Sequence, residues 1–118
     1  MTETWIRGCV VQRIMFRDGL VLNLDDTPGT EARYVLEAKD RKLGLQAIFS
    51  ELAGAMENRE AGAAIAVFSS QNRAPSPVPF SYRGDKAIVV LDKDEPDLSA
   101  LRLATMWARW IVRRKLVE

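Results

Sequence analysis

The chain has 118 residues, of which 47% are hydrophobic and 28% are charged, and its formal net charge is +1. This length and balance fit one globular domain with a core, and a net charge so near zero excludes a global electrostatic attraction to nucleic acid. The sequence has no histidine and one cysteine, which excludes histidine-based catalysis, zinc sites built on histidine or four cysteines, and an internal disulfide.

Three β-strands are predicted in the N-terminal third of the chain. Residues 9–16, 20–24 and 34–38 are apolar and rich in β-branched side chains, which favours strands. A turn signal, Arg17-Asp18-Gly19, separates the first two, and a loop with Pro28-Gly29 separates the second from the third. Short connections of this kind predict an antiparallel meander.

The rest of the chain switches between helical and strand patterns. Residues 45–57 have helical period, while 63–68 and 86–91 are continuous apolar runs typical of strands buried on both faces. Residues 71–85 contain three prolines and are predicted as a long loop, and a second helix is predicted from Asp97 almost to the C-terminus. The predicted apolar stripe of the first helix is Leu45, Ile48, Phe49, Leu52 and Met56.

These elements predict one α/β domain over residues 1–118, with the order βββαββα and a mixed sheet flanked by helices. No apolar run in the sequence approaches the roughly 20 residues of a membrane span, and the start Met-Thr-Glu-Thr-Trp lacks the pattern of a signal peptide. The lone Cys9 fits a reducing compartment. We therefore expect a cytoplasmic protein with no membrane partner.

Two opposite charges close the third predicted strand. Glu37 and Lys39 are separated by one residue, so in a strand their side chains project from the same face. The pair is either an ordinary solvent-facing ion pair, contributing at most about 1 kcal/mol, or half of a metal site. With histidine absent, carboxylates and backbone carbonyls are the ligands that remain, and they suit Mg²⁺, Mn²⁺ or Ca²⁺.

Asp18, then a strand, a loop, and Glu37-Ala38-Lys39 closing the next strand before a helix resembles the PD-(D/E)XK nuclease superfamily, which has the restriction-endonuclease-like fold. The resemblance spans roughly residues 14–92, and the stretch from 20 to 68 is also similar to poorly characterised nuclease-like domains of bacteria and archaea. It implies a metal-dependent nuclease that acts on DNA. Asp18, Glu37 and the carbonyl of Ala38 would hold Mg²⁺ or Mn²⁺, and Lys39 would act on the attacking water or on the transition state.

The position of Asp18 leaves two interpretations open. The superfamily places this acid directly before the apolar strand, whereas Asp18 stands one position earlier, and a slip of one residue turns a side chain to the other face. A bulge at Gly19 would restore the ligand position. Otherwise Asp18 is a turn former, with Asp25 as a more distant substitute, and the domain is a catalytically inactive module for nucleic-acid binding or assembly.

Basic residues near this motif give a second expectation. Beside Lys39, we expect a phosphate-binding rim formed by Arg41, Lys42, Arg73 and Arg83; the alternative for these side chains is solvated surface.

The C-terminal helix is apolar on two faces. One face comprises Leu98, Leu101, Ala104, Ala108, Ile111 and Val112, and the other comprises Leu103, Met106, Trp107 and Trp110. A helix packed on one sheet needs only the first face. The superfamily's usual first helix has no room before residue 9, so we expect a minimal core or a fragment of a longer protein. We expect the second face to form a homodimer or to dock onto a missing neighbouring domain; alternatively, the segment around Trp5 and Ile6 covers it.

Overall fold

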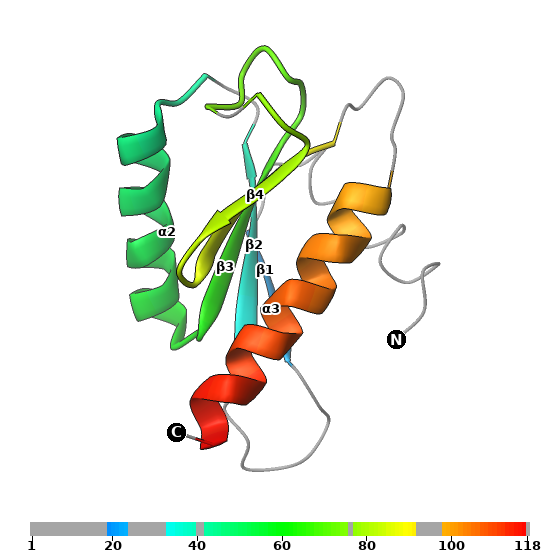
Figure 1. Ribbon diagram of the computed structural model, residues 1–118. Coiled ribbons are helices and arrows are strands. Elements are labelled where there is room, and N and C mark those ends of the chain that lie inside the picture. Colours follow the sequence, from blue (N-terminus) through cyan, green and yellow to red (C-terminus); the bar gives the residue numbers. More distant parts are fainter. Residues whose placement is uncertain (1–18, 24–32, 40–41, 76, 92–97, 118) are drawn as a thin grey trace.

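The structure is a computed structural model that describes residues 19–23, 33–39, 42–75, 77–91 and 98–117; for 19–23 it describes the backbone. These residues form five strands and two helices (Figure 1). In chain order they are β1 (Gly19–Asn23), β2 (Arg33–Lys39), α2 (Leu45–Arg59), β3 (Ala63–Phe68), β4 (Phe80–Arg83), β5 (Lys86–Val90) and α3 (Ser99–Val117).

The strands form one mixed sheet in the order β1-β2-β3-β5-β4. The three central strands β2, β3 and β5 are parallel, while β1 runs antiparallel to β2 and β4 runs antiparallel to β5. The predicted antiparallel pairing of the strands near 20–24 and 34–38 is confirmed, and its register places Gly19 opposite Glu37. Helix α2 connects the parallel neighbours β2 and β3, as such a pair requires.

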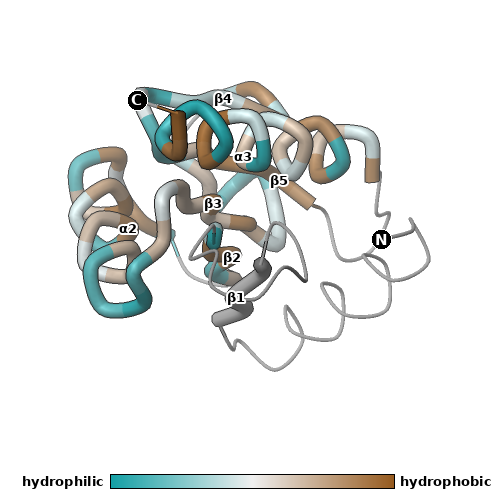
Figure 2. The backbone as a smooth tube through the Cα atoms, turned by 90° about the horizontal axis from the view of Figure 1, so that it is seen from below, coloured by the Kyte–Doolittle hydropathy of each residue, from teal (hydrophilic) through white to brown (hydrophobic). Residues whose placement is uncertain are grey.

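The two helices lie on opposite faces of this sheet and make a three-layer α/β arrangement. Side chains alternate along each strand, so the central strands supply a core to each helix. Figure 2 shows that each helix has hydrophobic and hydrophilic sides. The core under α2 contains Val35, Ala64, Ala66, Phe68 and Ile88 from the sheet, with Ile48 and Leu52 from the helix. The core under α3 contains Tyr34, Leu36, Ala63, Ile65, Val67, Ala87, Val89 and Leu91, with Leu101, Ala104, Ala108 and Val112 from the helix.

The packing of the helices follows most of their sequence pattern. The predicted inner face of α3 is confirmed, since Leu101, Ala104, Ala108 and Val112 are buried. In α2, Ile48 and Leu52 are buried and Phe49 and Met56 pack against them in part. Leu45 departs from the prediction and is exposed, because it stands in the first turn, beyond the edge of the sheet core. No helix in the described ranges is long and apolar enough to cross a membrane.

Strand β4 corrects the prediction of a loop over residues 71–85. Phe80–Arg83 pairs with β5 through a two-residue turn, Gly84-Asp85, in which Gly84 has φ +63°. Glycine at the first position of such a turn allows the backbone twist that a tight hairpin needs. The three prolines favoured a loop, but the last of them, Pro79, precedes the first residue of β4. Its missing N–H therefore removes no hydrogen bond from the strand. The Gly-Asp pair between two strand-like runs was the signal for this hairpin.

The observed order of elements therefore differs from the predicted βββαββα. Over the described residues it is ββαβββα, with β4 added. The strand predicted over 9–16 and the helix start at Asp97 lie outside the described residues. The α/β class and the mixed sheet are confirmed, and the restriction-endonuclease-like fold stays a prediction.

Candidate functional site

Strand β2 presents Glu37 and Lys39 toward α2. Tyr34 and Leu36 belong to the core under α3 and Val35 belongs to the core under α2, so Glu37 and Lys39 share the face of Val35. The expectation that the two charged side chains project from one face is confirmed, because both contact residues of α2.

Each of these two charges is paired with a charge from the helix. The Nη1 of Arg59 lies 3.0 Å from Oε1 of Glu37, and Nζ of Lys39 lies 3.3 Å from Oε2 of Glu51. The side chains of Glu37 and Lys39 are only 18% and 16% exposed, so solvent screens them less than it screens a typical surface pair. These ion pairs hold the carboxylate and the ammonium in place, but they also use one oxygen of Glu37 and part of the hydrogen-bonding capacity of Lys39.

The C-terminal end of α2 also contacts β2 through the backbone of the helix. The Nη1 of Arg33, at the start of β2, donates a hydrogen bond to the carbonyl oxygen of Arg59 at 3.2 Å. That carbonyl belongs to the last turn of the helix, where backbone acceptors lack partners within the helix. Arg59 thus contacts β2 through both its backbone and its side chain, which aligns α2 over Glu37.

Glu51 is a candidate site residue that the sequence pattern did not single out. It did not belong to the predicted apolar stripe of α2. Its place three residues after the buried Ile48 and next to the buried Leu52 puts it at the margin of the stripe, where a long side chain reaches the sheet. A carboxylate at the margin of an apolar helix stripe was the available signal.

Of the other predicted metal ligands, the structure describes Ala38 but not Asp18. Asp18, like Asp25, lies outside the described residues; the neighbouring Gly19 is opposite Glu37 in the ladder. Ala38 turns its side chain toward the core under α3, and its carbonyl as a ligand stays a prediction. Within the described ranges no three acidic or cysteine side chains gather in a way that could hold a metal ion.

The predicted phosphate rim comes from separate segments. Lys42 precedes α2 and is exposed, Arg73 lies in the loop after β3, and Arg83 ends β4. Arg41 lies outside the described residues. Arg83 is held with its guanidinium 5.2 Å from the ring centroid of Phe49, a cation–π distance. A shared rim stays a proposal.

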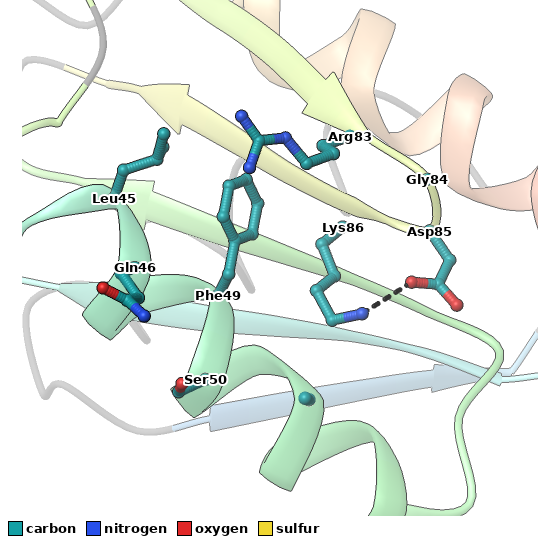
Figure 3. A pocket seen from close by; sticks show the side chains of 9 residues that line it. Leu45, Gln46, Phe49, Ser50, Arg83, Gly84, Asp85 and Lys86 are labelled. Atoms are coloured by element: carbon teal, nitrogen blue, oxygen red, sulfur yellow. Dashed lines mark hydrogen bonds and ion pairs between the residues drawn. The ribbon is translucent and has the colours of Figure 1, made fainter.

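Arg83 belongs to an open groove between α2 and the β4–β5 hairpin. The groove has a volume of about 690 Å³. Figure 3 shows Arg83 above the ring of Phe49, with Gln46 and Ser50 on the helix side and Lys86 beside Asp85 on the hairpin side. The full lining is Leu45, Gln46, Phe49, Ser50, Ala53, Arg83, Gly84, Asp85 and Lys86.

Asp85 is the acidic member of this lining, and two lysines bind it. Nζ of Lys86 lies 2.9 Å from one carboxylate oxygen, and Nζ of Lys115, near the end of α3, lies 2.7 Å from the other. Burial alone would raise the pKa of Asp85, but the hydrogen bonds and charges of Lys115 and Lys86 outweigh burial and lower the pKa below its usual value. Asp85 is therefore a carboxylate at neutral pH, and its charge is more than balanced.

The second apolar face of α3 is largely open to solvent. Leu103, Met106 and Trp110 are 52%, 63% and 55% exposed, and Tyr82 of the edge strand β4 is 62% exposed. We call Tyr82, Leu103, Met106 and Trp110 the aromatic patch. Trp107 differs from the prediction for this face in being half-buried: its ring centroid lies 5.6 Å from that of Tyr82 and 6.3 Å from that of Phe80.

Comparisons of the chain with protein-family models, with curated proteins and with solved structures find no match. The functional assignment therefore rests on the chain's own residues and their geometry.

Proposed function

We propose that this chain is a Mg²⁺-dependent nuclease of restriction-endonuclease-like fold that hydrolyses DNA phosphodiester bonds. Glu37 is a metal ligand, Asp18 the second carboxylate, and Lys39 the cation beside the reacting phosphate. The observation that carries the proposal is the placement of Glu37 and Lys39 on one face of β2. That strand lies between the antiparallel β1 and the parallel β3, and α2 crosses over it.

Of the proposed carboxylate ligands, Glu37 lies in the described residues, and its chemistry suits a magnesium ion. Mg²⁺ is usually held by one or two carboxylates and keeps several of its waters, so a dense acidic cluster is not required. Glu37 accepts from Arg59 through one oxygen, and a carboxylate has about four lone-pair sites, so it retains capacity for an ion. When bound, the ion would supply charge neutralisation at the phosphate and a more acidic water.

The chain's own residues position the other charges. Glu51 holds the ammonium of Lys39 at 3.3 Å, in a side chain that is mostly shielded from water. A preorganised cation in such a place stabilises negative charge that develops on a phosphate without reorganising at the moment of reaction. Arg59 holds Glu37 by the same principle, so the orientation of both side chains is set by α2.

A second candidate function is supported by the same ion pairs. Because Arg59 occupies one oxygen of Glu37, the acid also has a structural explanation, as a tie between β2 and α2. In that case the domain is a nuclease-fold module without catalysis that binds nucleic acid or assembles with a partner.

The deciding experiment compares Glu37→Gln with Glu57→Gln, which makes the same change at an exposed position of α2. With Mg²⁺ or Mn²⁺ and a panel of single-stranded, duplex and branched DNA, we expect cleavage that EDTA abolishes. Glu37→Gln and Lys39→Met should each reduce cleavage by about a hundredfold or more, while Glu57→Gln leaves it unchanged.

Two results would contradict the nuclease. Cleavage that persists undiminished in Glu37→Gln would come from another protein in the preparation. DNA binding measured by fluorescence anisotropy without any cleavage, and unchanged by Glu37→Gln, would establish the non-catalytic alternative.

A further inference from the structure

We propose that the groove between α2 and the β4–β5 hairpin binds a phosphate monoester carried on an apolar or aromatic body. The phosphate lies at Arg83 and Lys86, and the body rests against Phe49 and Leu45. This inference does not depend on the proposed nuclease activity, because Glu37 and Lys39 take no part in it and a different flank of α2 is involved; Arg83 alone is shared with the predicted phosphate rim.

The groove is separated from Glu37 and Lys39 by the helix itself. Gln46, Phe49 and Ser50 of α2 face the groove, whereas Glu51 and Arg59 of the same helix contact β2. In the sheet, β2 lies on one side of β3, and both β5 and β4 lie on the other side of β3. The groove is therefore a distinct site on the β5–β4 side of α2.

Its size and lining suit an organic ligand rather than a bare ion. A volume of about 690 Å³ falls within the range of roughly 300–1,000 Å³ that is usual for small-molecule sites. One wall is apolar, from Leu45, Phe49 and Ala53, and polar groups converge from the opposite wall and the helix flank. An inorganic anion would leave the apolar wall exposed to water. An apolar or aromatic body on the ligand would cover this wall, and burying that apolar surface favours binding.

The charges of the lining favour an anion. Arg83 and Lys86 contribute two positive charges and Asp85 contributes one negative charge. Lys115, which is not part of the lining, binds the second carboxylate oxygen of Asp85 and offsets its charge. A phosphate monoester carries about −1.5 to −2 at pH 7, whereas a carboxylate carries −1, so two lining cations match the phosphate better.

Several donors in the groove have no partner in the described part of the chain. Arg83 makes no ion pair there; its guanidinium lies over the ring of Phe49, and the residue is exposed. The amide of Gln46 and the hydroxyl of Ser50 make no hydrogen bond in the same part of the structure. Arginine offers a planar fork of donors that fits phosphate oxygens in pairs, and an amide and a hydroxyl complete such a shell.

The same chemistry has two sources, a free mononucleotide-like phosphate and the terminal phosphate of a nucleic-acid strand. We would titrate the ¹⁵N-labelled full chain with inorganic phosphate, phenyl phosphate, adenosine 5′-monophosphate and a short 5′-phosphorylated single strand, in EDTA to exclude catalysis. We expect phenyl phosphate and the mononucleotide to bind at least about tenfold more tightly than inorganic phosphate, with shifts at groove residues. Tighter binding of the strand at the same residues assigns the strand terminus as the source, and weaker binding assigns the free ligand.

Two neighbouring substitutions provide the matched control. Gln46→Glu and Ala47→Glu both add an acid to the exposed first turn of α2, but only position 46 lines the groove. Gln46→Glu and Arg83→Gln should each weaken the mononucleotide by about tenfold or more, and Ala47→Glu should not. None of the three substituted side chains is part of a core, so we expect each variant to fold, and its amide spectrum would check this.

The proposal is overturned by any of three results. These are no saturable shift with the mononucleotide at about 10 mM, equal affinity for inorganic phosphate and the organic phosphates, or equal weakening by Ala47→Glu and Gln46→Glu. If cleavage of DNA fails while the groove binds phosphate monoesters, the groove stands and only the nuclease is lost.

Discussion

The two faces of the sheet are built in different ways. On the face of α3, strand side chains such as Leu36 and Val67 meet Leu101 and Ala104 in an apolar core. On the face of α2, the apolar core stops at Val35 along β2, and the strand continues with Glu37 and Lys39, which the helix matches with charges. The groove with Arg83 lies on this second face as well.

This difference separates stability from chemistry. Burial of apolar surface contributes most of the free energy of folding, whereas partly exposed ion pairs contribute little. The α3 face therefore acts mainly as the scaffold. The α2 face can carry polar groups in fixed positions because the opposite face supplies the stability that they do not.

The largest expected effect is on the scaffold. Leu101 is fully buried, so Leu101→Ala should lower the free energy of unfolding by about 2–5 kcal/mol through lost burial and a residual cavity. Glu37→Gln, on the other face, should lower it by no more than about 1 kcal/mol. Urea denaturation of the two variants would measure both. If Glu37→Gln costs as much as Leu101→Ala, the ion pairs are structural and the division between faces is wrong.

A second effect concerns the outer side of α3. We propose that the aromatic patch of Tyr82, Leu103, Met106 and Trp110 associates with a second copy, because an exposed patch of this kind marks an interface. Sedimentation equilibrium at high micromolar concentration should show a dimer. Trp110→Ala combined with Met106→Lys should weaken it by about 2 kcal/mol or more, since aromatic anchors dominate interfaces.

Leu116→Lys is the control for that experiment, because Leu116 is an exposed apolar residue of α3 outside the patch. A wild-type chain that sediments as a monomer would refute the homodimer and leave the two alternatives, docking onto a neighbouring domain or coverage by the segment around Trp5 and Ile6.

The smallest effect is expected at Asp85, the carboxylate that joins the two faces through Lys86 and Lys115. Its pKa in the folded chain is lowered from the ordinary 3.8. A lowered folded-state pKa stabilises the fold above pH 3.8, and this contribution is lost as the pH falls through the folded-state value. Asp85→Asn should therefore be less stable than wild type at neutral pH, with the difference shrinking below pH 3.8. Urea melts across this range would test it, and a difference that is independent of pH would contradict the linkage.

Much of the scaffold was predictable from local patterns. The continuous apolar runs of β3 and β5 predicted strands buried on both faces, and the helical spacing of Leu101, Ala104 and Ala108 predicted the inner face of α3. In the candidate site, the one-residue spacing of Glu37 and Lys39 predicted a common face. These features follow from the strand and helix periods, which act over a few residues and are therefore written directly in the sequence.

The partners of these residues were decided by the tertiary structure. Arg59 reaches Glu37 across 22 positions of the chain because α2 runs back over β2, and no local period encodes that approach. Strand β4 has only four residues, and its pairing with β5 orders a segment that its prolines had marked as loop. That hairpin brings Arg83 over Phe49 and forms one wall of the groove. The groove therefore exists only once α2 and the hairpin, which are distant in sequence, are packed together. The sequence by itself determined which faces are apolar and which are charged; packing over long separations decided which charges meet, because contact between distant segments depends on the whole fold.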